Sequence, residues 1–400
     1  MDTLFARHDR QIKSASLKFI RSYMTSINWT TRLLAIRGAR GIGKTTLMLQ
    51  YIKQNYKALD RQVLFCSLDS VYFSTHTILE LADRFYKMGG KHLFLDEVHK
   101  YANWSQEIKE VYDAYPDMRI VLSGSSALKL QQGDADLSRR CVNYDMQGLS
   151  FREYLGIYAK VNIPVFLLED ILHHPSDLCA AVYDKCRPLQ HFQQYLRYGY
   201  YPFYLDNSTD YYTLIDQVAG FIIETELPLL CKVDPANTRK IKALLNVLAM
   251  NVPYQLDMTK LAGMIQVIRT TVQEYLQHLQ SARLLNLLYS DLISVKKMQK
   301  PDKIYLENPN LLYALSPVKE PHIGTVRECF AVNQLSASHI VEYGKANGDF
   351  KVDSRYVLEI GGEDKTFKQI ANIPESYILA DDIETPAGNK LPLWVLGFLY

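Results

Sequence analysis

Residues 38–45 of the chain have the composition of a phosphate-binding loop. Their sequence, GARGIGKT, matches the pattern G-x-x-x-x-G-K-[ST] at every fixed position. The apolar run LLAIR precedes the loop and the amphipathic run TTLMLQYIKQ follows it, which is the strand–loop–helix context that such a loop requires. Glycines let the backbone curl until successive N–H groups converge on one anion, and the following helix adds its positive N-terminal dipole. The pattern therefore predicts binding of nucleotide phosphates.

The residues of this loop divide into phosphate-binding and metal-binding groups. Lys44 would place a point charge on the β- and γ-phosphates, and the hydroxyl of Thr45 would be a ligand for Mg²⁺. The other members contribute backbone N–H groups. The predicted nucleotide-binding residues are Gly38, Ala39, Arg40, Gly41, Ile42, Gly43, Lys44, Thr45 and Thr46.

Two adjacent carboxylates, Asp96 and Glu97, end the apolar run HLFL. A strand end of this kind lies at the edge of a parallel sheet where ligands bind. Asp96 is predicted to hold the magnesium ion, directly or through water, and Glu97 to polarise a water molecule for attack on the γ-phosphate. The second acid favours hydrolysis over transfer of the phosphoryl group to a small metabolite. His99 follows closely and could contact the site, although we expect it on a helix surface.

A third strand end supplies Ser123, after the apolar run RIVL. We expect its hydroxyl to lie between the two carboxylates and to respond to the γ-phosphate, although serine is also an ordinary turn residue. In a ring or dimer, Arg139 or Arg140 could stabilise transition-state charge at a neighbouring chain's nucleotide. The alternative is a solvated pair, or ion pairs with Asp134 and Asp136. The predicted catalytic residues are Glu97, Lys44, Ser123 and Arg140, and the predicted metal ligands are Thr45 and Asp96.

The composition of the 400-residue chain is that of a globular protein: 48% of the residues are hydrophobic and 22% are charged. These proportions exclude a disordered chain, a collagen-like chain and a long coiled coil. The 45 basic and 43 acidic residues give a net charge of +2, so that any basic site must be local. The 6 cysteines include no C-x-x-C pair, the N-terminus is polar, and the longest apolar run, LPLWVLGFLY, is too short to span a bilayer. We expect a cytoplasmic protein without a membrane segment.

Strand-like runs alternate with helical patterns from residue 31 to residue 147, which predicts an α/β fold. The runs are almost continuously apolar, as is typical of a parallel sheet covered on both faces. A helical, tyrosine-rich region follows, and we expect many of the 28 tyrosines to pack in its core. The strand-like runs are LLAIR, QVLFCSL, HLFLDE, RIVLSGS and CVNYDM.

Several motifs resemble those of a known family. GARGIGKTTLMLQ, LFLDEVHKY, IVLSGSSALKL and LSFREYL look like motifs of predicted bacterial and archaeal AAA-type ATPases that carry a C-terminal domain of unknown function related to restriction nucleases. The run LRYGYYP is similar to that family's L-x-x-G-G-x-P element, with Tyr200 in place of the second glycine. The resemblance covers residues 19–400. It implies the strand order 5-1-4-3-2 for the ATPase core, with ATP and Mg²⁺ as its ligands.

Residues 237–308 are predicted to form a winged helix. Helical patterns at 238–250, 257–266 and 269–282 precede a strand pair, and an apolar face repeats along the third helix. The lysines of the wing could contact DNA phosphates without reading sequence, or the domain could pack on other domains or proteins. The apolar face consists of Val272, Tyr275, Leu276 and Leu279, the opposite face of Arg269, Thr270, Gln273 and Gln277, and the wing carries Lys296, Lys297, Lys300 and Lys303.

Residues 309–400 are predicted to form a nuclease-like α/β domain. Glu328 in a helix, with Asp349 and Glu359 in strand-like runs, has the residue types of a PD-(D/E)-x-K site, where carboxylates bind Mg²⁺ and a lysine helps to activate water. The position expected for that lysine is Gly361, and the nearest candidate is Lys365, beyond a Gly-Gly turn. We therefore expect an incomplete site, retained for binding or packing.

Together these observations predict four segments: an ATPase core at 1–150, a helical lid at 151–236, the winged helix at 237–308 and the nuclease-like domain at 309–400. The predicted activity is Mg²⁺-dependent binding and hydrolysis of ATP, which shifts the lid and winged helix relative to the core. Two alternatives stay open: a nucleotide-binding scaffold or sensor with negligible turnover, and an ATP-regulated nuclease. The partners considered are the nucleotide, DNA and further copies of the chain.

Overall fold

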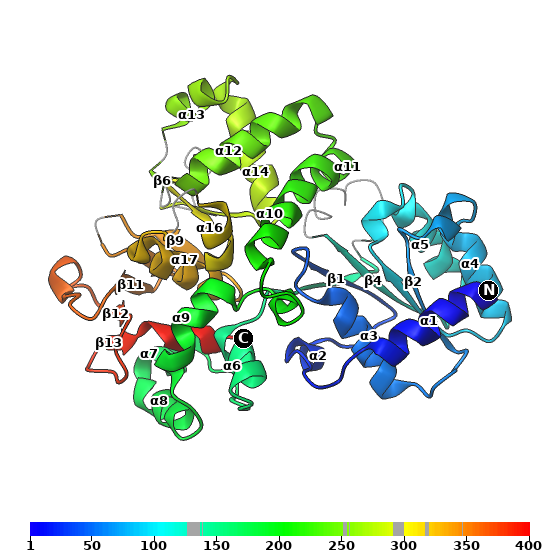
Figure 1. The fold of residues 1–400 in the computed structure, drawn as a ribbon, viewed down its shortest axis with the longest axis horizontal. Helices are drawn as coiled ribbons and strands as arrows, with labels where there is room; N and C mark the ends of the chain where they lie inside the picture. The colour runs from blue at the N-terminus through cyan, green and yellow to red at the C-terminus, as the bar shows by residue number, and fades with distance from the viewer. Residues whose placement is uncertain are drawn as a thin grey trace. The chain divides into compact units, whose positions relative to one another are not determined.

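The computed structural model describes residues 1–125, 137, 139–250, 254–255, 257–290, 300–316, 320–345 and 347–400. The chain divides into two compact units, Met1–Gln147 and Gly148–Tyr400 (Figure 1). Of the helices described, none combines the length and the apolar character needed to cross a bilayer. The finer division into four segments stays a prediction.

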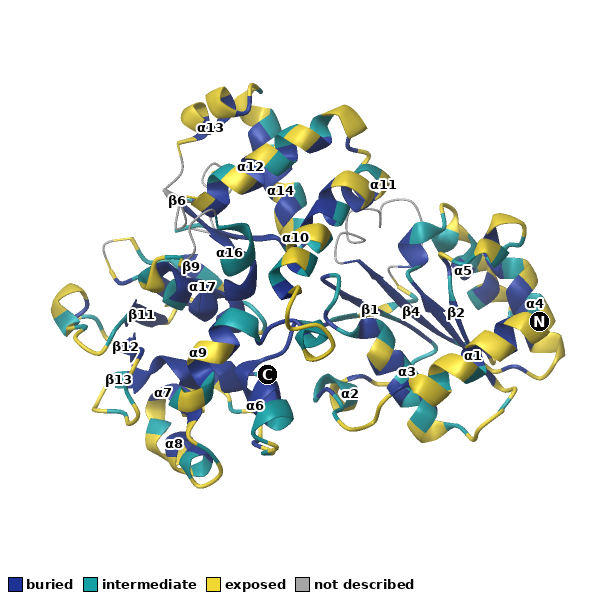
Figure 2. Ribbon diagram, viewed as in Figure 1, coloured by how far each residue is buried: buried dark blue, intermediate teal, exposed yellow. Residues whose placement is uncertain are grey.

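The first unit is built on a five-stranded parallel sheet with the strand order β2-β3-β4-β1-β5. Read from the β5 edge, this is the order 5-1-4-3-2 that the resemblance implied. Strands β1 to β4 are almost entirely buried (Figure 2), as expected of apolar strands between two layers of helices. The strands are β1 (Leu33–Gly38), β2 (Val63–Ser67), β3 (His92–Asp96), β4 (Arg119–Ser125) and β5 (Val142–Asp145).

Helices cover both faces of this sheet (Figure 1). The connection from β1 to β2 crosses the sheet in one direction, and the connections from β2 to β3 and from β3 to β4 cross it in the other. Because such crossovers are right-handed, the helix of the first connection and the helices of the other two lie on opposite faces of the sheet. Accordingly, α1 and α3 contact each other, as do α4 and α5. The helices are α1 (Asp2–Ser14), α2 (Tyr23–Ser26), α3 (Lys44–Asn55), α4 (Ile78–Lys87) and α5 (Trp104–Ala114), with short 3₁₀ helices η1 (Val71–Ser74) and η2 (Val98–Lys100).

The edge strand β2 is covered by α1. The backbone N–H of Phe65 in β2 donates a hydrogen bond of 3.0 Å to Nδ1 of His8 in α1. Burial lowers the pKa of His8, which favours the neutral ring that this contact needs, because a protonated Nδ1 cannot accept a hydrogen bond. Leu4 and Phe5 of α1 are buried, as His8 is.

The second unit begins with a helical, tyrosine-rich region. As expected, several of its tyrosines pack inside: Tyr195, Tyr200 and Tyr211 are buried. The hydroxyl of Tyr200 donates a hydrogen bond of 3.1 Å to Oε1 of the buried Glu307. The helices are α6 (Phe151–Tyr158), α7 (Leu168–His173), α8 (Pro175–Tyr183), α9 (Pro188–Tyr198), α10 (Tyr211–Phe221) and α11 (Leu227–Cys231), with the short helices η4 (Pro202–Leu205), η5 (Ile222–Glu226) and η6 (Pro235–Asn237).

Among the described residues of 237–308, the three predicted helices are followed or joined by strands that form a small antiparallel sheet, where the prediction had a strand pair. The sheet has the order β6-β8-β7. The predicted apolar face of the third helix is buried, and Arg269, Thr270 and Gln277 on its other side are exposed. The elements are α12 (Thr238–Met250), β6 (Tyr254–Gln255), α13 (Met258–Met264), α14 (Arg269–Ser281), β7 (Leu285–Leu288) and β8 (Lys303–Leu306).

The C-terminal part of the second unit holds a mixed five-stranded sheet with the order β13-β12-β11-β10-β9. Strands β9 to β11 form an antiparallel meander, and β12 and β13 run parallel to β11. The apolar C-terminal run ends in the buried 3₁₀ helix η8 (Leu393–Phe398). The other elements are α16 (Pro309–Leu315), α17 (Ile323–Leu335), β9 (Val341–Tyr343), β10 (Phe350–Val352), β11 (Tyr356–Gly361), η7 (Phe367–Gln369), β12 (Ser376–Ala380) and β13 (Lys390–Pro392).

Candidate functional site

The predicted phosphate-binding loop connects β1 to α3. Gly38 ends the strand, and Ala39 to Gly43 form the loop. Gly41 and Gly43 have φ values of 84° and 95°, in the left-handed region that glycine adopts without steric cost. Because Gly43 is the N-cap, α3 begins at Lys44 and the free N–H groups of its first turn lie beside the loop. In this loop and turn Ile42 is fully buried, whereas Thr46 is exposed.

The ammonium group of Lys44 lies within the loop. Its Nζ donates hydrogen bonds of 3.0 Å to the carbonyl oxygen of Gly38 and 2.8 Å to that of Ala39. The side chain is buried, so these bonds replace part of the hydration that the charge has lost. They hold the ammonium group where phosphate oxygens could take over as its acceptors.

Three strand ends bring the predicted metal ligands and Ser123 together. The Oγ1 of Thr45 donates a hydrogen bond of 2.9 Å to Oδ2 of Asp96. The hydroxyl of Ser123 donates to the other oxygen of the Asp96 carboxylate and accepts a hydrogen bond of 3.2 Å from the N–H of Glu97. Burial, reinforced by the adjacent charge of Glu97, raises the pKa of Asp96. A nearby cation would stabilise the charged form of this carboxylate.

Thr45 and Asp96 fit a magnesium ion in their chemistry. They offer a hydroxyl and a carboxylate oxygen 2.9 Å apart. Mg²⁺ prefers oxygen ligands and keeps several of its waters, so that one or two protein ligands together with nucleotide phosphates suffice. Within the part of the chain that the structure describes, no group of three or more His, Cys, Asp or Glu residues is arranged to hold a metal ion by protein ligands alone.

Glu97 has an unusual backbone conformation directly after β3. Its φ is 54°, a left-handed conformation that costs a non-glycine residue about 1–2 kcal/mol. Strain of this kind is concentrated at functional sites. Its carboxylate Oε2 lies 3.8 Å from Nη1 of Arg40 in the loop and 3.3 Å from Nε2 of His99.

The expectation for His99 is wrong. The residue lies in η2 and is 3% exposed, so it does not lie on a helix surface. The tight turn after Asp96 directs the chain back towards β4, and this places the imidazole beside Glu97. The sequence signal was its spacing of two residues from a predicted catalytic carboxylate.

Arg140 lies at the opposite edge of the sheet from the phosphate-binding loop. It precedes β5, and because all five strands are parallel, this is the edge where strands begin. A strand of the length of β1 spans about 20 Å. The Nε of Arg140 lies 3.2 Å from Oδ1 of Asp113, near the end of α5. The alternative partners Asp134 and Asp136 lie outside the described residues, and a role of Arg140 at a neighbouring chain's nucleotide stays a prediction.

One of the four wing lysines is placed differently from the prediction. Lys303 is 9% exposed in β8, and its Nζ lies 3.3 Å from Oε2 of Glu328 in α17. The expectation that Lys303 contacts DNA is therefore wrong, because the charge is already paired inside the second unit. Lys300 is exposed. Lys296 and Lys297 lie outside the described residues.

The predicted nuclease-like residues are brought closer to one another than their spacing suggested. After the Gly-Gly turn the chain folds back, so that Nζ of Lys365 lies 2.5 Å from Oε1 of Glu359 on β11. The Oδ2 of Asp349 accepts a hydrogen bond of 2.9 Å from the N–H of Ile360. Burial raises the pKa of Glu359, and the charges of Asp349 and Glu328 act in the same direction. Lys365, the lysine nearest to position 361 in the sequence, thus lies against both Glu359 and Gly361.

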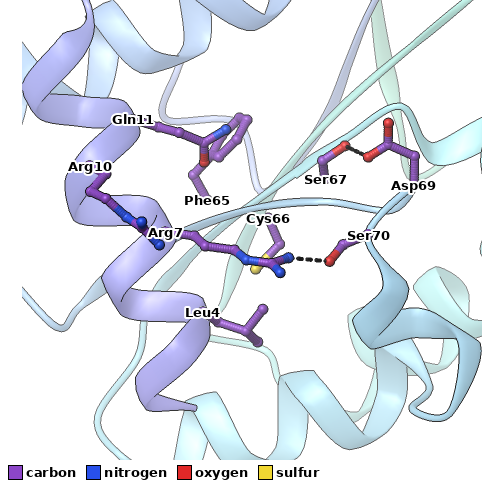
Figure 3. Close-up of a pocket in the computed structure, with 9 residues that line it drawn as sticks. All are labelled: Leu4, Arg7, Arg10, Gln11, Phe65, Cys66, Ser67, Asp69 and Ser70. Atoms are coloured by element: carbon purple, nitrogen blue, oxygen red, sulfur yellow. Dashed lines mark hydrogen bonds between the residues drawn. The ribbon is translucent and has the colours of Figure 1, made fainter.

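A separate groove of about 340 Å³ lies between α1 and the end of β2 (Figure 3). Arg7 reaches across it from α1, and its Nη1 donates a hydrogen bond of 2.6 Å to Oγ of Ser70. None of the residues predicted for the nucleotide site lines this groove. The lining residues are Leu4, Arg7, Arg10, Gln11, Phe65, Cys66, Ser67, Asp69 and Ser70.

Two parts of the chain match known family models. Residues 30–155 match the model described as an AAA domain, and residues 189–322 match a domain of unknown function, DUF8612. The second match ends before α17 and the C-terminal sheet. Residues 30–155, which hold the phosphate-binding loop, are thus similar to an AAA domain, and this similarity supports nucleotide binding in general terms.

The chain is also similar to individual proteins. It is 28% identical to the uncharacterized protein MJ1637 of Methanocaldococcus jannaschii, over 92% of this chain and 84% of that protein. A signal transduction ATPase with numerous domains and a tetratricopeptide repeat sensor, PH0952 from Pyrococcus horikoshii, aligns with a TM-score of 0.28 and 13% identity over 80% of this chain and 45% of the other. AMPPCP-bound DnaA from Aquifex aeolicus aligns with a TM-score of 0.27 and 15% identity over 64% of this chain and 84% of that one. The chain thus spans less than half the length of PH0952.

Proposed function

We propose that the chain binds ATP with Mg²⁺ and hydrolyses it. The observation that carries this proposal is the contact of Thr45 with Asp96, which joins the phosphate-binding loop to the strand end where Glu97 follows. A loop that only bound phosphate would need Lys44 and the backbone N–H groups. The added pair of carboxylates supports a site that also activates water.

Each residue of the site has a role in the proposed reaction. Lys44 exchanges the carbonyl oxygens of Gly38 and Ala39 for oxygens of the β- and γ-phosphates. Glu97 accepts a hydrogen bond from the attacking water and takes up its proton as the bond to the γ-phosphorus forms. The bond from that phosphorus to the bridging oxygen breaks at the same time, and ADP leaves. Ser123 fixes the relative positions of Asp96 and Glu97 through its two hydrogen bonds. Mg²⁺, held by Thr45 and Asp96, would supply positive charge to the phosphate oxygens.

Two measurements on the purified full-length chain test this proposal. Phosphate release with ATP and Mg²⁺ measures hydrolysis, and titration calorimetry measures nucleotide binding. We expect one nucleotide bound per chain and steady production of free phosphate. Binding without turnover, also in the presence of DNA, would favour the scaffold or sensor alternative. Labelled γ-phosphate on a small acceptor would favour a phosphotransferase. A switch of the second unit with the nucleotide state would appear as different small-angle scattering profiles with ATP analogue and with ADP.

DNA remains a proposed partner of the three-helix segment. With Lys303 paired to Glu328, the proposal rests on Lys296, Lys297 and Lys300, with Arg269 on the exposed face of α14. We expect duplex binding that weakens steeply with salt, and replacement of Lys296, Lys297 and Lys300 by alanine should lower the salt slope by about 2–3. Fluorescence anisotropy with labelled duplexes at several salt concentrations measures this, and an unchanged slope would contradict it.

A second candidate function, an ATP-regulated nuclease, is favoured by the position of Lys365 against Glu359. Against it, Glu328 is engaged by Lys303 and by the hydroxyl of Tyr305. If the site cleaves DNA, supercoiled plasmid should be nicked with Mg²⁺ or Mn²⁺, and Asp349→Ala should lower the rate by about 100-fold or more because a metal-binding carboxylate is lost. Gel electrophoresis measures the nicking. The exposed Asp364→Ala is the control, and equal nicking by parent and both variants would indicate a contaminating nuclease.

A further inference from the structure

We infer that His99 is a positioning residue that orients the carboxylate of Glu97 for the activation of water. The inference rests on the proposed hydrolysis of ATP and assigns to that reaction a residue outside the predicted catalytic set. His99 lies in η2, directly after β3, and its side chain is almost completely buried. The ring is therefore shielded from solvent, and the packing around it restricts its orientation.

The first neighbour is the end of β4. The backbone N–H of Ser125 donates a hydrogen bond to Nδ1 of His99 across 3.4 Å. A neutral imidazole carries one proton, and a nitrogen that accepts a hydrogen bond must be the unprotonated one. The contact with Ser125 therefore favours the ring form in which the proton is on Nε2.

The second neighbour is the Glu97 carboxylate, whose Oε2 lies 3.3 Å from that Nε2. The angle of this contact is not that of a hydrogen bond in the structure, but a rotation of the Glu97 carboxylate towards the ring would let a proton on Nε2 reach Oε2. The histidine would then fix one carboxylate oxygen and leave the other for water. The arrangement joins β4 to the proposed base through a single buried ring. Once the second hydrogen bond forms, the ring that Ser125 holds would set the orientation of the carboxylate.

The guanidinium of Arg40 also lies near the Glu97 carboxylate, at 3.8 Å. Its side chain is 38% exposed and belongs to the phosphate-binding loop, whereas that of His99 is 1% exposed. Triphosphate in the loop would attract the guanidinium of Arg40 because the two carry opposite charges. The contact with His99 would persist, since the ring is held by the fold. His99 would then keep Glu97 oriented once the nucleotide is bound.

Two substitutions separate positioning from packing. His99→Asn retains an acceptor near the Ser125 N–H but removes the donor that reaches Glu97, and we expect kcat for ATP to fall about 10- to 100-fold. His99→Gln restores a donor at the distance of Nε2 and should recover most of kcat. Since neither change touches the phosphate-binding loop, the Kd of ATP by calorimetry should stay within about twofold of the parent value. His76→Asn, in a histidine that stacks on Tyr72, is the control and should leave kcat unchanged.

The double variant with Glu97→Gln decides whether His99 acts through Glu97. If it does, His99→Asn should cause no further loss of kcat in that background. Equal losses in both backgrounds, an unchanged kcat, or a glutamine variant no better than asparagine would overturn the inference. Thermal unfolding of each variant shows whether a loss of kcat reflects a loss of fold.

The ring form can be measured without any turnover. We expect ¹⁵N NMR of histidine-labelled chain near pH 8 to show His99 protonated on Nε2, and protonation on Nδ1 would overturn the inference. If the parent chain does not hydrolyse ATP, the proposed function fails, but this spectrum still tests the geometry of His99. The two failures can therefore be told apart.

Discussion

The Glu97→Gln variant is expected to release phosphate from ATP about 100 to 10,000 times more slowly than the parent chain. Glutamine has nearly the same shape as glutamate but cannot accept a proton from water. The contact between Ser123 and the N–H of Glu97 involves only the backbone, so the variant should keep the geometry of the strand end. The rate is measured as kcat under saturating ATP, and we expect this kcat to fall while the affinity for ATP does not.

The matched control is Glu110→Gln, an exposed residue of α5. It removes the same charge from the same unit without touching the site, and its kcat should equal that of the parent. ATP affinity of Glu97→Gln, measured by calorimetry, should stay the same or increase slightly, since a negative charge close to the γ-phosphate is removed. If Glu97→Gln retains the parent rate, another group is the base.

The Lys44→Ala variant is expected to bind ATP about 100-fold more weakly, which corresponds to about 3 kcal/mol. The ammonium group is the one side-chain cation that the loop directs inward, through its bonds to Gly38 and Ala39. Removing it deletes its charge-assisted hydrogen bonds with the phosphates. Titration calorimetry with ATP and with ADP measures the change, and Lys44→Met, which keeps the aliphatic stem, should give a similar result.

Lys53→Ala provides the control for Lys44. Lys53 lies at the other end of α3, where Nζ bonds the carbonyl oxygens of Lys13 and Ala15. Both substitutions remove a lysine that bonds backbone carbonyls, so both can lower the unfolding temperature, but only Lys44→Ala should weaken ATP binding. If ATP binds Lys44→Ala and the parent equally, or if folded parent chain binds no nucleotide, the proposed function is wrong.

The proximity of the proposed nucleotide-site residues could be predicted from the sequence because the chemistry fixes their spacing. A phosphate-binding loop needs its glycines and lysine within a few adjacent positions, and acidic residues at a strand end are found from a local apolar run. The predicted contact of Ser123 with Asp96 followed from parallel strands ending at one edge. The strand order itself came with the resemblance to a family, since spacing alone leaves several orders open.

The wrong or incomplete expectations concern residues whose surroundings come from distant parts of the chain. Lys303 pairs with Glu328, 25 residues further on. Arg140 pairs with Asp113 on a preceding helix. Lys365 reaches Glu359 because a turn reverses the chain, which residue spacing alone does not show. In each case a charged side chain that the sequence suggested was open to a ligand forms an ion pair with another residue of the chain.

The contact between His8 and Phe65 bears on how copies of this chain could associate. Exposed edge strands recruit further strands through their unpaired backbone groups. On the β2 side, α1 occupies that position and its imidazole takes up a donor that an incoming strand would require. Edge-to-edge pairing of two sheets through β2 would therefore require α1 to move away from this strand.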